Sequence, residues 1–83
     1  MTRYMVIEHF HENCLERIYS RFRAMGRMLP EDLIYLDSWL VLDGCCCFQL
    51  METDRFESFA EWTVRWDDLA DFEIFELGDR PAA

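Results

Sequence analysis

The stretch LIYLDSWLVLDGCCCFQLME, residues 33–52, decides the fold of this 83-residue chain. Two apolar runs flank the pair Asp43-Gly44, and an Asp-Gly pair between such runs is typical of a two-residue type I′ turn. The twist of that turn matches the twist of two antiparallel strands, so it joins them without splaying them apart. The stretch therefore predicts a β-hairpin with strands over residues 33–42 and 45–52.

A two-residue turn also fixes which residues of the two strands lie opposite one another, because side chains alternate between the faces of a strand. Ser38 is expected opposite Gln49 on one face, and Trp39 opposite Phe48 on the other. Apolar residues surround both pairs, so each face of the hairpin is largely apolar. The remaining expected pairs are Leu36–Met51, Asp37–Leu50, Leu40–Cys47, Val41–Cys46 and Leu42–Cys45.

The segments on either side of the hairpin each predict one strand and one helix. YMVIEHF (residues 4–10) and FEIFEL (residues 72–77) are rich in the β-branched and aromatic residues that favour strands. Asn13 is positioned to cap a helix that ends near Gly26, and Asp54 is positioned to cap a second helix. The order β-α-β-β-α-β predicts an α+β, ferredoxin-like fold. In that fold a four-stranded antiparallel sheet has two helices on one face and the first and third strands at its centre.

The apolar character of the sheet predicts how the chain assembles. Two helices can cover only one face of a four-stranded sheet, whereas both faces of this hairpin are apolar. The uncovered face would be a larger apolar surface than soluble monomers usually tolerate. A second copy of the same sheet is the simplest cover, through a two-fold contact in which both copies use the same surface. We therefore predict a homodimer through the sheet faces; the sequence leaves open which face meets the helices.

The charge composition limits the partners of the chain. The formal net charge is −9, the isoelectric point is about 4.4, and all eight basic residues are arginines. A uniformly acidic surface repels nucleic-acid phosphates and anionic lipid headgroups, so neither nucleic acid nor a membrane is an expected partner. No apolar run approaches the ~20 residues that a membrane span needs. We expect one soluble, cytoplasmic domain over residues 1–83, in which the cysteines stay reduced.

The chain contains the segments YMVIEHF, RFRAMGRMLP, YLDSW, CFQLMETD and EWTVRWDDLADFE. These segments resemble a small uncharacterised bacterial domain family, and the resemblance covers nearly the whole chain. That family is placed among the dimeric α/β-barrel proteins, which have the ferredoxin-like fold. The resemblance implies the fold and the homodimer but no established activity, so no functional residue is carried over. The family pattern has one cysteine before FQLMET where this chain has three, which implies that Cys45 and Cys46 are incidental.

The three consecutive cysteines, Cys45 to Cys47, allow a metal site, a reactive thiol or small apolar residues in a strand. Zinc sites usually take four ligands, often from paired C-x2-C motifs, and Cys14 is the only other cysteine in the chain. Free cysteines are among the residues most often buried, where they pack as small apolar side chains. We favour that packing role and expect no metal and no cofactor.

Polar residues interrupt the apolar strands at a few positions, and these are the candidates for a ligand pocket. Buried polar groups need hydrogen-bond partners or a wet cavity, so the Ser38–Gln49 pair fits a small-molecule pocket or a network that fixes the strand register. His9 fits an acid, base or hydrogen-bond donor in a pocket, or a strand-end histidine satisfied by a neighbour. Trp62 fits a cavity wall or the core. The candidate set is His9, Asp37, Ser38, Trp39, Gln49 and Trp62.

Three functions are compatible with these features. The first, which we favour, is a homodimeric module that binds a small apolar or aromatic molecule or has a structural role. The second is a cofactor-independent enzyme of the monooxygenase or isomerase type that uses His9 or the polar patch at residues 37–39. The third is a subunit that docks on a larger protein through the arginines of its first helix, such as Arg17 and Arg21. The sequence assigns no catalytic residue.

Overall fold

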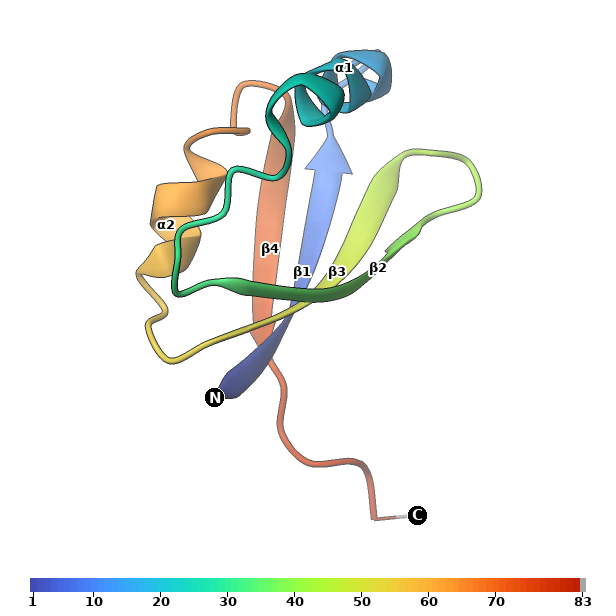
Figure 1. Ribbon diagram of the computed structural model, residues 1–83. Coiled ribbons are helices and arrows are strands. Elements are labelled where there is room, and N and C mark those ends of the chain that lie inside the picture. Colours follow the sequence, from blue (N-terminus) through green and yellow to red (C-terminus); the bar gives the residue numbers. More distant parts are fainter. Residues whose placement is uncertain (83) are drawn as a thin grey trace.

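The computed structural model describes residues 1–82 and contains the six predicted elements in the predicted order. The strands form one antiparallel sheet in the order β2-β3-β1-β4. The predicted α+β fold with ferredoxin-like topology, and with the first and third strands at the centre of the sheet, is therefore confirmed. In chain order the elements are β1 (Thr2–Phe10), α1 (Leu15–Met25), β2 (Ile34–Leu40), β3 (Cys46–Thr53), α2 (Ser58–Thr63) and β4 (Ala70–Glu76) (Figure 1).

The hairpin register is as predicted near the turn and differs at the far end of β2. The pairs Ser38–Gln49 and Trp39–Phe48 are confirmed, as are Asp37–Leu50 and Leu40–Cys47. The predicted Leu36–Met51 pair is wrong, because Tyr35 lies opposite Met51 and a register shift separates Tyr35 from Asp37. An extra residue in one strand makes a β-bulge of this kind and bends that strand.

The turn of the hairpin differs from the predicted two-residue type I′ turn. The Gly44 N–H donates to the Val41 carbonyl over 2.8 Å, which places Leu42 and Asp43 at the centre of the turn. Gly44 has a φ of 77°, but Asp43 is not in the positive-φ region that a type I′ turn requires. Asp43 instead accepts the Cys45 N–H over 2.9 Å, so the predicted Leu42–Cys45 pair is wrong. The loop is therefore longer than the predicted two-residue turn by one residue on each side. The pairing of the strand residues next to the loop is unchanged.

The ends of the helices are only partly as predicted. Asn13 does not cap α1: the residue before the helix is Cys14, which makes no side-chain capping bond, and Asn13 itself has a φ of 60°. Asp54 does not cap α2, because that helix begins later and its cap residue is Glu57. Gly26 ends α1 with a φ of 68°, as predicted. No helix within residues 1–82 has the length and apolar character needed to cross a membrane.

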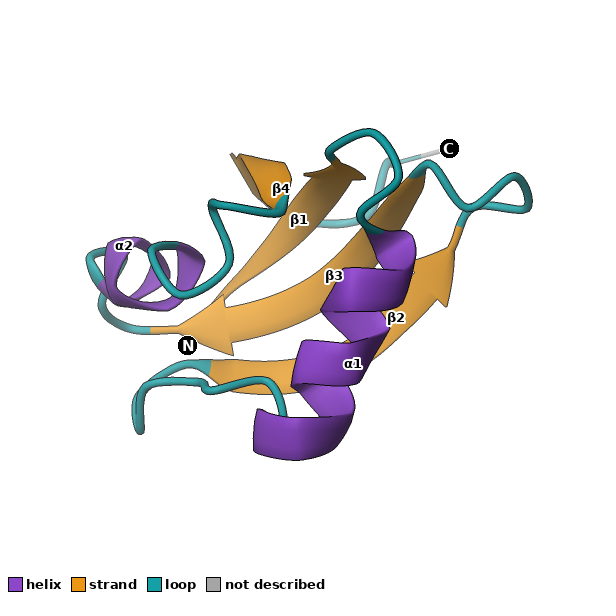
Figure 2. Cartoon of the chain, turned by 90° about the horizontal axis from the view of Figure 1, so that it is seen from above, coloured by secondary structure: helices purple, strands orange, loops and turns teal. Residues whose placement is uncertain are grey.

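Both helices lie on the same side of the sheet (Figure 2), as predicted, since side chains of α1 and α2 line one cavity with one face of β1, β2 and β3. We call this covered side of the sheet the inner face. The core lies between the inner face, α2 and the chain that follows α2. Its largest fully buried side chains are Trp62, Phe59, Met51, Leu69 and Val6.

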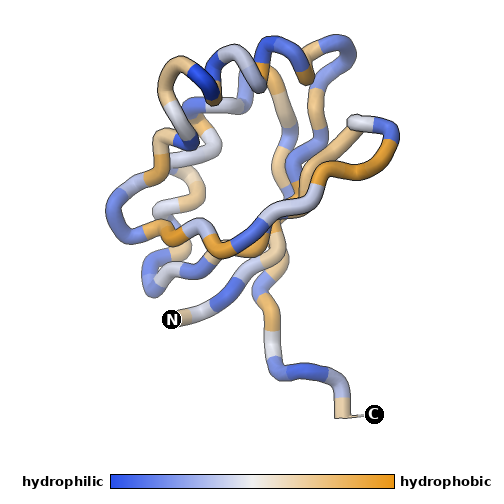
Figure 3. The backbone as a smooth tube through the Cα atoms, turned by 45° about the vertical axis from the view of Figure 1, so that its right-hand side comes forward, coloured by the Kyte–Doolittle hydropathy of each residue, from blue (hydrophilic) through white to orange (hydrophobic). Residues whose placement is uncertain are grey.

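Helix α1 packs less completely than α2. Ile18 is the buried residue within α1, whereas Tyr19, Phe22 and Met25 are 41%, 39% and 63% exposed. The hairpin that joins β2 to β3 projects from the body of the chain beyond α1, and apolar residues follow most of its length (Figure 3). A cavity lies between α1 and the inner face.

The opposite side of the sheet, which we call the outer face, carries large apolar side chains that no helix covers. Cross-strand pairing places Met5 opposite both Leu50 and Phe75, and Phe48 opposite both Ile7 and Trp39. Trp39 is 51% exposed and Phe75 is 48% exposed. Apolar side chains thus follow the outer face across four strands. The six are Met5, Ile7, Trp39, Phe48, Leu50 and Phe75.

Candidate functional site

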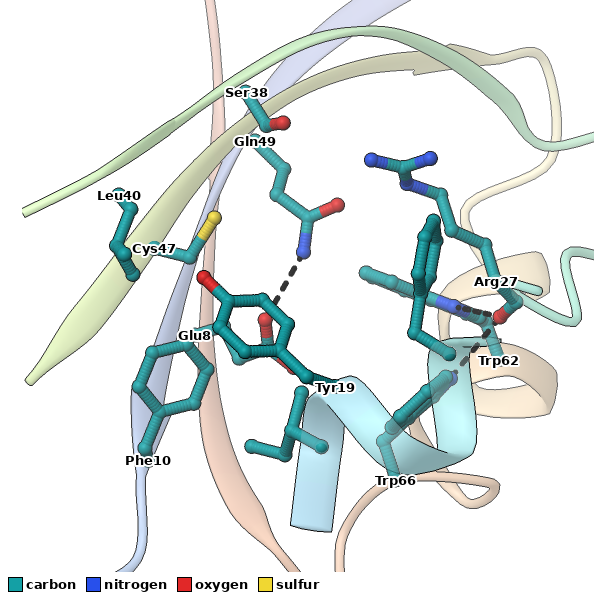
Figure 4. A pocket seen from close by; sticks show the side chains of 12 residues that line it. Glu8, Phe10, Tyr19, Arg27, Ser38, Leu40, Cys47, Gln49, Trp62 and Trp66 are labelled. Atoms are coloured by element: carbon teal, nitrogen blue, oxygen red, sulfur yellow. Dashed lines mark hydrogen bonds between the residues drawn. The ribbon is translucent and has the colours of Figure 1, made fainter. Parts of the chain in front are cut away.

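A cavity of about 190 Å³ lies between α1, the segment that follows it, α2 and the inner face of the sheet. Most of its wall is aromatic or aliphatic. The sheet contributes three polar side chains, Glu8 from β1, Ser38 from β2 and Gln49 from β3. Arg27, from the segment after α1, lines the same space (Figure 4). This arrangement, an apolar cavity with a few convergent polar groups, is the usual composition of a small-molecule site.

Glu8 and Gln49 form the polar floor of the cavity. Both are nearly inaccessible, with exposed fractions of 6% and 5%. The Gln49 side-chain nitrogen donates to a Glu8 carboxyl oxygen over 3.2 Å. The other amide atom, Gln49 Oε1, is buried and has no hydrogen-bond partner within residues 1–82. An unsatisfied buried acceptor costs about 1–3 kcal/mol, so this atom is one that a bound donor would satisfy.

Burial raises the pKa of Glu8 from 4.5 to about 7, although the Gln49 hydrogen bond and the charge of Arg27 act in the opposite direction. Removing a carboxylate from water disfavours its ionised form, which is why the pKa rises. At neutral pH both protonation states of Glu8 are therefore populated. A carboxyl group in this condition can accept a proton and return it, as general acid–base catalysis requires.

Arg27 is held at the cavity by contacts of both its backbone and its side chain. Its carbonyl oxygen accepts the indole N–H of Trp62 and that of Trp66, each over 3.0 Å. Its guanidinium lies 3.6 Å from the ring centre of Tyr35 and 5.0 Å from that of Phe22. Among the ion pairs within residues 1–82, none involves Arg27. The site thus has a positive charge that a ligand anion can pair with.

Three of the six predicted pocket residues line the cavity. Ser38 and Gln49 are adjacent on the inner face, as the predicted pairing requires, and Trp62 reaches the cavity from α2. The Ser38 hydroxyl also shares a 2.6 Å hydrogen bond with the Tyr35 hydroxyl. The polar pair therefore lies inside the molecule and belongs to a cavity wall.

The structure does not bring the other three predicted residues to the cavity. His9 is exposed on the outer face, where its Nε2 lies 2.5 Å from Glu73 Oε1. Trp39 is half exposed on the same face. Asp37 is exposed as well and accepts the backbone N–H of Ser38 over 2.8 Å. Alternation along each strand explains the separation, because neighbours in sequence point to opposite faces.

Sequence reasoning missed Glu8 and Arg27 as candidates for this site. Glu8 had a signal: it continues the alternation of Tyr4 and Val6, which are buried on the inner face, so a carboxylate falls where an apolar residue is expected. Arg27 had none, because its position depends on how the segment after α1 folds back over Tyr35 and the tryptophans.

The cysteine triplet has the properties of structural thiols. Cys46 is buried, Cys45 is exposed, and the four cysteines are free. A hydrogen bond with Asp43 is the main cause that raises the pKa of Cys45 to about 11, and burial raises the pKa of Cys47 to about 11. Thiols with raised pKa values are weak nucleophiles at neutral pH. Within residues 1–82 no three side chains of the metal-binding kinds converge.

Among the arginines of α1, Arg21 is engaged in contacts inside the chain. Arg21 makes two hydrogen bonds with the Asp68 carboxylate, over 2.8 and 2.7 Å, and a third with the Arg65 carbonyl over 2.9 Å. The hydrogen bonds from Arg21 to the carboxylate lower the pKa of Asp68 to about 2. Arg21 also stacks on Trp66, with 5.5 Å between guanidinium and ring centre. Arg21 therefore joins α1 to the chain after α2.

Fold and cavity together define a ferredoxin-like α+β domain with a small, mostly apolar pocket between its helices and its sheet. The chain belongs to the family described as Domain of unknown function (DUF3303), which matches residues 2–77. That span contains all six elements and every residue of the pocket. No curated protein and no solved structure matches the chain significantly.

Proposed function

We propose that this protein binds a small, single-ring molecule in the cavity on the inner face. The observation that carries the proposal is the buried Gln49 Oε1 atom, which has no partner within residues 1–82 and belongs to a residue that lines the cavity. Native proteins leave few buried acceptors unsatisfied, and those that exist need an explanation. A ligand N–H or O–H supplies the missing donor.

The walls and the volume define the kind of ligand. Apolar contact comes from Phe10, Ile18, Phe22, Trp62 and Trp66. The volume of about 190 Å³ is smaller than the roughly 300–1,000 Å³ of pockets that hold drug-sized molecules. These features favour one aromatic ring or a short apolar chain. Arg27 at the wall favours a ligand that also carries an acidic group.

We further propose that the protein is a homodimer of the dimeric α/β-barrel type, formed by two outer faces. The centre of the outer face carries apolar side chains on β1 and β3, while the polar pair His9–Glu73 lies toward one end. An apolar centre with a polar rim is the usual composition of a protein interface. A two-fold contact would cover the half-exposed Trp39 and Phe75 of both copies.

The free cysteines accord with a reducing compartment, and we propose a cytoplasmic location. All four cysteines of the chain are unpaired. Disulfides form and persist mainly in oxidising compartments, whereas cytosolic thiols are kept reduced. Expression with an added export signal tests this point, since unpaired cysteines in an oxidising compartment should produce disulfide-linked species on non-reducing gels.

Tryptophan fluorescence tests the binding function directly, because Trp62 and Trp66 line the cavity. Titration with a set of single-ring aromatic acids should give saturable quenching for at least one of them. Gln49→Met replaces the amide with an apolar side chain of similar size, and we expect it to weaken binding by at least about tenfold. The matched control is His9→Gln, on the outer face, which should bind like the wild type. Absence of saturable quenching, or equal affinity in Gln49→Met, would contradict the proposal.

A further inference from the structure

We propose that the cavity interconverts the keto and enol forms of a small aromatic 2-oxo acid, with Glu8 carrying the proton. This inference rests on the proposed binding function and adds a reaction to it. The reaction needs no cofactor and no oxidant, because it moves one proton and shifts one double bond within a single molecule.

Glu8 is placed to be the proton carrier. It is the carboxyl group among the residues that line the cavity, and within residues 1–82 its hydrogen bond is with Gln49. The second carboxyl oxygen is left for a ligand. Burial raises the pKa of Glu8 to about 7, which suits a group that must both take and return a proton near neutral pH.

Three other titratable side chains, those of Cys47, Tyr19 and Arg27, line the cavity with Glu8. Cys47 lies opposite Glu8 across the β1–β3 pairing, and burial raises the pKa of its thiol to about 11, so it stays protonated. Tyr19 reaches the cavity from α1, and Arg27 reaches it from the following segment. From α2 the contribution is the indole of Trp62, which does not titrate.

Gln49 selects the enol form over the keto form. Its buried Oε1 atom is a hydrogen-bond acceptor that has no donor within residues 1–82. An enol carries an O–H group that can donate to this atom, whereas the ketone oxygen only accepts. In Figure 4 the Gln49 nitrogen points toward Glu8 and its oxygen points to the side on which the Arg27 guanidinium lies. A site that stabilises the enol lowers the barrier to forming it.

Arg27 supplies the charge that a 2-oxo acid requires. Its guanidinium lies over the rings of Tyr35 and Phe22, at 3.6 and 5.0 Å from their centres. The ion pairs within residues 1–82 leave it without a carboxylate. A planar guanidinium pairs well with a planar carboxylate, through two parallel hydrogen bonds.

The reaction balances within the substrate. The ionised Glu8 carboxylate takes a proton from the carbon next to the ketone, and the electrons of that C–H bond form the carbon–carbon double bond. The π electrons of the carbonyl move onto its oxygen. That oxygen then receives the proton from Glu8, which returns to its ionised form, and the enol O–H donates to Gln49. The reverse sequence gives the ketone.

Phenylpyruvate in deuterium oxide is the probe for this reaction. Each proton transfer to Glu8 allows exchange with solvent, so the methylene signal of the probe should fade faster with the full chain than with buffer alone, as followed by proton NMR. The rate at low probe concentration should rise with pH through about 7, because the ionised carboxyl is the base. Glu8→Gln keeps the shape of the side chain, and it should lose at least about 100-fold of the acceleration while still binding the probe.

The matched control is Glu73→Gln, which changes a carboxyl group on the outer face and should exchange the probe like the wild type. Binding of phenylpyruvate without faster exchange, or full acceleration in Glu8→Gln, overturns the proton transfer and leaves the binding function standing. Binding of other ring acids but not of phenylpyruvate overturns the 2-oxo acid assignment. Absence of saturable binding for every ring acid overturns the binding function as well.

Discussion

The two faces of the sheet are built from alternate residues of the same strands, yet their polar groups behave differently. On β1, Glu8 is 6% exposed on the inner face, while His9, the next residue, is exposed on the outer face and pairs with Glu73. A polar group in solvent finds a partner at little cost, whereas a buried one is costly unless its surroundings satisfy it. The inner face therefore carries the candidate chemistry, and the outer face carries the candidate assembly surface.

The largest expected effect is the loss of packing on the inner side. Trp62 is 2% exposed, contacts Phe72 with 5.3 Å between ring centres, and donates its N–H to Arg27. We expect Trp62→Ala to lower the free energy of unfolding by about 3–5 kcal/mol, as large-to-small substitutions in cores do. Urea denaturation followed by circular dichroism measures this.

The matched control for this prediction is Val64→Ala, at the end of α2, where the side chain is 63% exposed. Surface substitutions of this kind change the free energy of unfolding by about 0.5 kcal/mol or less. Equal losses for the two variants would show that the wall of the cavity is not part of the core.

The pH dependence of stability tests the difference between the two faces at the buried carboxyl group of Glu8. The pKa of Glu8 is raised from 4.5 to about 7 in the folded state, so the folded state holds the proton more strongly than the unfolded state. Stability from this group is fully present below pH 4.5 and is lost as the pH rises through about 7. At about 1.4 kcal/mol per pKa unit, the loss amounts to roughly 3–4 kcal/mol at most.

Comparison with Glu8→Gln isolates this contribution, because the amide side chain does not ionise. Unfolding free energies of the two proteins should be similar near pH 4.5, and the variant should become the more stable one above pH 7. Urea denaturation across this range measures the difference. A difference that does not change with pH would show that Glu8 titrates alike in the folded and unfolded states.

The sequence predicted those features of the fold that depend on local patterning. Alternation and the Asp43-Gly44 signal were enough for the element order and for most of the hairpin register. The turn type was wrong because the Asp43 carboxylate bonds the Cys45 N–H, a choice that the Asp-Gly pair does not reveal. The helix starts were wrong because neither Asn13 nor Asp54 sits at the residue that begins its helix.

The candidate site was less predictable because it depends on contacts between distant segments. The predicted register placed Ser38 opposite Gln49 on one face of the hairpin, and because this pairing is correct, both residues line the cavity. Arg27 lines the cavity because its carbonyl binds two indoles that are more than thirty residues away. His9 and Trp39 were assigned to a pocket without knowledge of which face the helices cover. Glu8 could have been predicted as a site residue, because its carboxylate occupies a position in β1 where the alternation calls for an apolar side chain.

A charge at the centre of the outer face should break the proposed dimer. Phe48 lies in the central strand β3, opposite Ile7 and Trp39. Phe48→Glu would bury two carboxylates at a two-fold interface, and we expect the dimer dissociation constant to rise at least about 100-fold, or about 2.7 kcal/mol. Sedimentation velocity measures the change, and circular dichroism checks that the monomer is folded.

The control places the same charge on the helix side. Val64→Glu changes an exposed residue at the end of α2, so it should leave the dimer intact. Wild-type protein that sediments as a monomer at micromolar concentration would contradict the dimer, as would dissociation caused equally by both variants. Neither result would affect the cavity, which lies within one chain.

The smallest expected effect concerns the cysteine triplet at the start of β3. Cys45 is exposed, and the bond from its backbone N–H to Asp43 remains when the thiol is replaced by a hydroxyl, so Cys45→Ser should leave the denaturation midpoint unchanged. Cys46 is 8% exposed, and placing a hydroxyl there should cost about 1–2 kcal/mol, since a buried hydroxyl needs a partner. Urea denaturation under reducing conditions measures both. A large loss in Cys45→Ser with little loss in Cys46→Ser would mean that the exposed thiol, and not apolar packing, is what the triplet contributes.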